Sequence, residues 1–109
     1  MKIVAVTSCP VGMAHTYIAG AALRDAAEQN GVEIKVETQG MTGISNAITK
    51  ADIKEADAAI LTKDVAIEQV ERFDGMLIFK TTTSKIIKNG DEIIKKTIEL
   101  INQNRSGEK

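Results

Sequence analysis

Hydrophobic residues along the chain fall into short β-rich runs separated by stretches of helical spacing. Residues 2–7 form an almost continuous apolar run, which is typical of a central parallel strand covered on both faces. Residues 32–37 alternate apolar and polar side chains, so we expect a second strand with one buried and one solvent-facing side, ending near Thr38. Two further apolar runs, residues 58–61 and 76–79, predict a third and a fourth strand.

Helical signals lie between these strands. From Gly12 to Asn30, small and apolar residues recur on one side of a helix, and Gly31 provides a stop. A final amphipathic helix is expected after Gly90, where the helical signal that follows the fourth strand is interrupted.

The remaining connections are shorter. We expect a helical piece over residues 44–48, a second one that Thr49 caps and that runs to about Glu55, and a helix over residues 66–73. Residues 81–84 are polar and predict a loop.

Strands that alternate with helices predict an α/β fold. We expect a three-layer sandwich in which a four-stranded parallel sheet of order 2-1-3-4 carries helices on both faces. Such sheets bind ligands beyond the carboxyl ends of their strands, where the strand order reverses. Here that point lies between the first and third strands. Residues 1–103 are expected to form one domain and residues 104–109 a polar tail.

Composition and charge narrow the functional classes. The chain has 109 residues, of which 43% are hydrophobic, and a formal net charge of -1, which gives no electrostatic footprint for nucleic acid. No apolar run approaches the roughly 20 residues that span a bilayer, so we expect a cytoplasmic protein. One cysteine cannot form an internal disulfide, and one cysteine with one histidine is too few ligands for a zinc site unless a second chain contributes. We therefore expect no metal and no cofactor.

The residues with candidate chemistry lie in one loop, between the first strand and the first helix. They are Cys9, Pro10, Val11, Gly12, Met13, Ala14, His15 and Thr16. A loop that closes onto a helix start presents unpaired backbone N–H groups and the positive end of the helix dipole, which together bind anions such as phosphate. The same field favours the thiolate form of a cysteine and lowers its pKa.

Each polar side chain of this loop also has a structural interpretation. A lone cysteine is usually a small buried hydrophobe, but Cys9 follows the apolar run at the carboxyl edge of the sheet, which favours a reactive thiol. His15 is expected either to donate to a bound phosphate or to shape the loop. Thr16 is expected either to bind phosphate or to help cap the helix.

The spacing Cys-x5-His-Thr invites comparison with the Cys-x5-Arg-Ser/Thr loop of low-molecular-weight tyrosine phosphatases and thiol arsenate reductases. His15 stands where those enzymes have an arginine, and one donating nitrogen cannot replace a bidentate guanidinium clamp. Efficient hydrolysis is therefore not expected, whereas holding a phosphocysteine for a later acceptor needs less.

Other loops should share the rim around Cys9. Gln39, Gly40 and Gly43 follow the second strand and are expected there. Asp64, at the end of the third strand, is expected either to face the same rim or to start a loop and cap the next helix.

Two motifs carry a family resemblance. With Cys-Pro-Val-Gly-Met-Ala-His-Thr at 9–16 and Val-Glu-Thr-Gln-Gly at 36–40, residues 1–103 resemble the enzyme IIB component of fructose-type phosphoenolpyruvate-dependent sugar phosphotransferase systems. Arg72 and Phe73 also look like this family. The chain has Val11 where the family usually has a hydroxyl residue, so phosphate binding would rely more on backbone N–H groups.

The resemblance implies a phosphotransferase with Cys9 as its phosphorylated nucleophile. In that family the cysteine accepts a phosphoryl group from a phosphohistidine on enzyme IIA and passes it to a sugar carried by the membrane subunit, enzyme IIC. It implies a cytoplasmic protein that associates peripherally with the permease. Two alternatives stay open: a phosphatase or arsenate-reductase-like thiol enzyme, and a non-catalytic signalling module read by a regulator.

Overall fold

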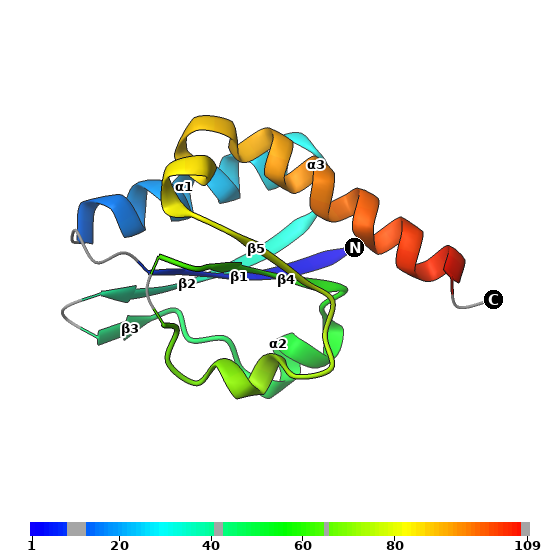
Figure 1. The fold of residues 1–109 in the computed structure, drawn as a ribbon, viewed down its shortest axis with the longest axis horizontal. Coiled ribbons are helices and arrows are strands. Elements are labelled where there is room, and N and C mark those ends of the chain that lie inside the picture. Colours follow the sequence, from blue (N-terminus) through cyan, green and yellow to red (C-terminus); the bar gives the residue numbers. More distant parts are fainter. Residues whose placement is uncertain (9–12, 41–42, 65, 108–109) are drawn as a thin grey trace.

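The computed structural model describes residues 1–8, 13–40, 43–64 and 66–107. Its five strands form one sheet in the order β3-β2-β1-β4-β5 (Figure 1). Four neighbouring strands are parallel, and only the short β3 runs antiparallel, against the end of β2. The strands are β1 (Lys2–Ser8), β2 (Glu33–Gly40), β3 (Gly43–Ser45), β4 (Ala58–Thr62) and β5 (Ile78–Thr81).

Helices cover both faces of the sheet. The two long helices, α1 (Met13–Gln29) and α3 (Thr83–Gly107), pack on one face, while α2 (Lys50–Glu55) and the 3-10 helix η1 (Val70–Phe73) lie on the other (Figure 1). The central strand β1 contributes alternate residues to each side: Ile3 and Ala5 face the long helices, and Val4 and Val6 face η1 and the segment before α2. The continuous apolar run in the sequence therefore reflects burial on both faces.

The expected order 2-1-3-4 is confirmed for the parallel strands, which are β2, β1, β4 and β5 here. The helix that Thr49 was expected to cap is also present, because Thr49 and Asp52 form a reciprocal capping box at the start of α2. Within the described residues, no helix is both long and apolar enough to cross a membrane.

The expected helical piece at 44–48 is wrong, and the sheet has a fifth strand there instead. β3 pairs with β2 from Thr38 to Gly40, and Gly43 has a φ of 111°, which side chains rarely tolerate. Asn46 also takes a left-handed φ of 54°. The backbone groups at the end of β2 thus find partners in an antiparallel neighbour, an interaction that periodicity cannot reveal.

The expected helix at 66–73 is wrong over its first half, since only η1 at its end is helical. The Gln39 side chain occupies the backbone N–H and carbonyl of Glu68, and Gln69 has a left-handed φ of 60°. These backbone groups are therefore unavailable for helical hydrogen bonds. A contact from a distant strand overrides the local helical pattern.

The solvent-facing side expected for the second strand is also wrong near its end. Glu37 is fully buried, and Gln39, the next side chain on the same side of the strand, is buried as well. The segment 66–73 and the chain before α2 cover this face, as the side-chain contacts of Glu37 and Gln39 demonstrate.

The C-terminal helix begins earlier than expected, and the interruption expected at Gly90 is present as a break at the preceding residue, Asn89. α3 starts at Thr83, so most of the expected 81–84 loop belongs to β5 and α3, and the helix reaches Gly107. It kinks at Asn89, where φ is -139° and ψ is 45°. Gly90 lies against α1, and a Cβ there would stand 3.2 Å from the carbonyl oxygen of Ala22. The absent side chain lets the two long helices approach closely.

We predict that Gly90→Val destabilises the protein by about 2 kcal/mol, because the branched side chain would overlap the Ala22 carbonyl and force α1 and α3 apart. Lys88→Val is the matched control, since it places the same β-branched residue at an exposed site of the same helix. Urea unfolding of both variants measures the difference. Equal losses for the two variants would contradict a close helix contact at Gly90.

Candidate functional site

The carboxyl ends of the parallel strands meet at one edge of the sheet. Ser8, which directly precedes Cys9, is in register with Gln39 of β2, and Thr62 of β4 pairs with Thr81 of β5. Because β1 lies between β2 and β4, the loop after Ser8 leaves the sheet where the strand order reverses. Ser8 therefore ends its strand at a topological switch point, the place where such sheets commonly bind ligands.

Three side-chain contacts hold the two ends of this loop. The backbone N–H of Ser8 donates to the hydroxyl of Thr62 at 2.9 Å, and that hydroxyl lies 3.2 Å from the Ser8 carbonyl oxygen. On the other side, the Thr7 hydroxyl donates to the backbone carbonyl of Thr16 at 3.1 Å. The strand end and the helix start are thus tied to each other and to β4.

Of the eight loop residues singled out in the sequence, Cys9, Pro10, Val11 and Gly12 lie outside the described residues. Met13 and Ala14 begin α1, which carries no acidic residue in its first turn. No acidic side chain of that turn therefore opposes the attraction of the helix dipole for an anion.

His15 and Thr16 belong to the same first turn but differ in exposure. His15 is exposed, whereas Thr16 is only 1% exposed. None of the described residues offers a hydrogen-bond partner to the Thr16 hydroxyl. A buried hydroxyl without a partner costs free energy of folding, so its presence next to the Cys9 loop calls for an explanation.

The four expected rim residues all lie along the carboxyl edge. Gln39 and Gly40 end β2, and Gly43 pairs with Gly40 across the antiparallel ladder. Asp64 accepts hydrogen bonds from both the backbone N–H and the hydroxyl of Thr83, each at 3.0 Å. Asp64 therefore holds the first residue of α3, and not the start of the next helix along the chain, which the sequence had suggested.

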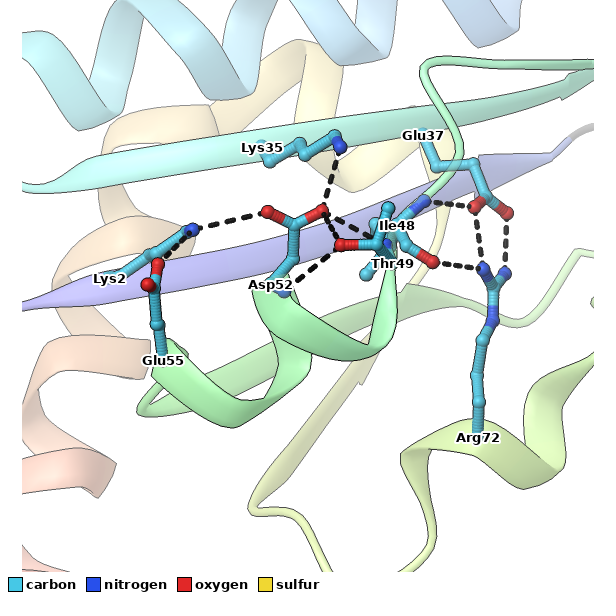
Figure 2. Close-up of polar contacts among 8 residues, drawn as sticks. All are labelled: Lys2, Lys35, Glu37, Ile48, Thr49, Asp52, Glu55 and Arg72. Atoms are coloured by element: carbon cyan, nitrogen blue, oxygen red, sulfur yellow. Dashed lines mark hydrogen bonds and ion pairs between the residues drawn. The ribbon is translucent and has the colours of Figure 1, made fainter.

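Near the carboxyl end of β2, Glu37 forms a buried ion pair with Arg72 (Figure 2). The guanidinium of Arg72 donates to both carboxylate oxygens of Glu37, at 2.7 and 2.5 Å, and also to the carbonyl of Ile48 at 3.1 Å. Glu37 further accepts from the backbone N–H of Ile48 at 2.8 Å and from the amide of Gln39 at 2.8 Å. β2, the chain before α2 and η1 are joined through one carboxylate.

The ionised form of Glu37 is favoured despite its burial. Burial by itself raises the pKa of this carboxyl group, but the hydrogen bonds from Arg72, Ile48 and Gln39 outweigh it, and the pKa falls below its ordinary value of 4.5. Glu37 is thus a charged, fully paired group.

Sequence reasoning missed this pair. The alternation of β2 suggested that Glu37 faces water, and nothing local links it to Arg72, 35 residues later. The sequence did contain one signal for this contact. Glu37 and Arg72 both belong to segments that carry the family resemblance.

A second charged cluster lies closer to the amino ends of β1 and β2 and fixes α2 there (Figure 2). Asp52 accepts from Lys35 at 2.7 Å and from Lys2 at 3.3 Å. The hydrogen bond from Lys35, followed by those from Thr49, lowers the pKa of Asp52 well below its usual range.

Across the described ranges, no group of three or more His, Cys, Asp or Glu side chains could hold a metal ion.

Comparisons with known proteins place this chain in a family. A family model described as "PTS system, Lactose/Cellobiose specific IIB subunit" matches residues 4–96. The chain belongs to the PTS IIB family.

Individual members of this family align over almost the whole chain. The PTS system fructose-like EIIB component 2 of Escherichia coli (strain K12) is 50% identical over 95 residues, which are 87% of this chain and 90% of the relative. The solution structure of the enzyme IIB subunit of the PTS system from E. coli K12 superimposes with a TM-score of 0.88 at 41% identity, covering 95% of this chain and 96% of that one. A domain of the fructose-specific IIABC component from Borrelia burgdorferi gives a TM-score of 0.83 at 48% identity, with 93% of each chain covered.

We predict that Glu37→Gln lowers the free energy of unfolding by about 3 kcal/mol at pH 7, because Arg72 is left as a largely buried charge without its partner. The pKa of Glu37 is lower in the folded state, so the stabilisation is complete above pH 4.5 and is lost as the pH falls below it. The variant should therefore lose less stability than the wild type between pH 5 and about pH 3. Urea unfolding at several pH values measures both effects.

Glu33→Gln is the control for this variant, because Glu33 is an exposed glutamate of the same strand. Its free energy of unfolding and the pH dependence of that free energy should match those of the wild type. A pH profile of Glu37→Gln that parallels the wild-type profile would contradict an ionised, paired Glu37.

Proposed function

We propose that the chain is a phosphocysteine carrier in sugar uptake. Cys9 accepts a phosphoryl group from a phosphohistidine on an enzyme IIA and passes it to fructose or a fructose-like sugar that an enzyme IIC carries across the membrane. The observation that carries the proposal is the position of Cys9, between the end of the central strand β1 and the first turn of the 17-residue helix α1, in a chain of the PTS IIB family. The names of its fructose-like relatives support the sugar class.

In both phosphoryl transfers, each bond that forms is matched by one that breaks, and each electron pair and proton has an acceptor. In the first, the Cys9 thiolate attacks phosphorus as the P–N bond breaks, and the electron pair returns to the imidazole of the donor. In the second, a sugar hydroxyl oxygen attacks phosphorus, the S–P bond breaks and the thiolate is restored. The hydroxyl proton passes to a base of the membrane partner. A thiolate is a good leaving group, so the second step needs no general acid on this chain.

The start of α1 supports stabilisation of the transferring group. Phosphoryl transfer passes through a state with charge spread over the phosphoryl oxygens, and backbone N–H groups at a helix start suit such charge. The first turn of α1 has no acidic residue to oppose an anion. The unpartnered hydroxyl of Thr16 is the described side chain best suited to add one more donor.

We predict that a fructose-type enzyme IIA carrying radiolabelled phosphohistidine transfers its label to Cys9. Cys9→Ser should retain the fold and take up no acid-stable or thiol-linked label, because its hydroxyl is a far weaker nucleophile than a thiolate. Rapid quenching, proteolysis and mass spectrometry locate the group, and circular dichroism checks the fold.

The same mixture separates the proposed carrier from its alternatives. Adding membranes that contain enzyme IIC and fructose should discharge the label to the sugar. Label that no sugar discharges would favour a signalling module, and turnover of an aryl phosphate or arsenate by the isolated chain would favour a thiol hydrolase or reductase. Label on another residue would overturn the proposal.

We predict that Thr16→Val slows phosphorylation of Cys9 about tenfold, which corresponds to the loss of one hydrogen bond to a charged group. The folded protein should be no less stable than the wild type, because the buried hydroxyl that valine replaces has no hydrogen-bond partner among the described residues. Thr16→Ser keeps the hydroxyl and should react at close to the wild-type rate. A Thr16→Val variant that is phosphorylated at the wild-type rate would contradict a contact between this hydroxyl and the phosphoryl group.

A further inference from the structure

A groove of about 460 Å³ opens beside the carboxyl ends of β4 and β5, on the side of the sheet that carries η1. Its apolar wall is formed by Leu61, Ile67 and Val70, and polar side chains border it. Thr62 also lines the groove, and its hydroxyl binds the backbone of Ser8. Through Thr62, the groove therefore lies one hydrogen bond away from Ser8, which directly precedes the candidate nucleophile.

The border of the groove carries an excess of positive charge. Lys63 and Lys80 are exposed, and neither has an ion-pair partner among the residues that the structure describes. The acid that lines the groove is Asp64, and both of its carboxylate oxygens accept hydrogen bonds from Thr83. Two lysines thus remain available to a carboxylate or phosphate brought by a partner.

The apolar wall is exposed at Val70 and held in place by its neighbours. Val70 is 45% exposed, although it lies directly beside the half-buried Ile67 of the same wall. The clamp of Gln39 on Glu68 fixes the backbone between these two residues. A partner that fills the groove therefore meets a surface that is already ordered, which reduces the entropic cost of docking.

We propose that this groove docks the phosphohistidine donor, by receiving an apolar side chain of the donor at Val70 while acidic groups of the donor lie at Lys63 and Lys80. This inference rests on the proposed function. A donor arrives with about 1.5 to 2 negative charges on its phosphoryl group and leaves without them, so the lysines favour the loaded donor over the spent one. The sugar on the accepting partner is neutral and brings no phosphoryl charge, so the loaded donor is the partner that these lysines fit, and the accepting partner is an outcome of the test.

The test measures phosphorylation of Cys9 by rapid quenching at increasing concentrations of a fructose-type enzyme IIA that carries labelled phosphohistidine. Lys63→Gln combined with Lys80→Gln should lower the second-order rate constant at least fivefold at low ionic strength. The first-order rate constant at saturating donor should stay the same, because the lysines act on docking and not on the transfer. Added salt should shrink the difference, since it screens exposed charges.

Two further variants keep the test decisive. Val70→Ser should also raise the donor concentration needed for half-saturation, with little dependence on salt. Lys50→Gln combined with Lys54→Gln removes the same charge from exposed positions on α2 and should leave both rate constants unchanged. All of the substituted side chains are exposed, and circular dichroism confirms the fold of each variant.

Each remaining outcome overturns the inference in a distinguishable way. If wild-type Cys9 accepts no label, the proposed function and the docking site both fail. If the wild type is labelled and the groove variants match it, only the docking site fails. A fall in the saturated rate constant alone would place the lysines in the transfer chemistry. A defect confined to discharge by the sugar and its transporter would assign the groove to the acceptor.

Discussion

The buried carboxylate of Glu37 determines how the chain is arranged on the face of the sheet that carries α2 and η1. Three segments that are distant in sequence meet on it, because the ion pair with Arg72 and the hydrogen bonds from Ile48 and Gln39 satisfy its oxygens together. An ionised group in this position is tolerable only when it is fully paired. The segments must therefore adopt their native positions together, since each one supplies a partner that the others cannot replace.

The consequences of this carboxylate extend to the carboxyl edge of the sheet, where the proposed site lies. Gln39 links Glu37 to the backbone of Glu68, and it is also the residue in register with Ser8, next to Cys9. The side chain that satisfies the buried charge thus also positions the chain that borders the groove. On the other face, the long helices pack mainly through aliphatic residues, among them Leu23 and Ile94. Both layers have a hydrophobic core, and the layer that carries η1 adds a buried ion pair to it.

How far the sequence predicts this structure depends on whether the deciding interaction is local. The apolar run of β1, the four parallel strands and the capping box of Thr49 are encoded by neighbouring residues, and they were predictable. The strand β3 and the irregular chain before η1 were not, because their backbone hydrogen bonds go to β2 and to the side chain of Gln39. For the site, a motif indicated Cys9 and its loop, whereas the open groove at Lys63 and Lys80 depends on strand pairing that brings β4 and β5 together.

Both borders of the sheet are very short: β3 has three residues and β5 has four. Strands of this length expose few unpaired N–H and C=O groups, so another chain finds little backbone on which to add a strand. Recognition must then occur through loops and side chains, which separate faster than an extended ladder of main-chain hydrogen bonds. A fold with blunted edges is suited to a molecule that has to meet one partner, leave it and meet the next within a single cycle.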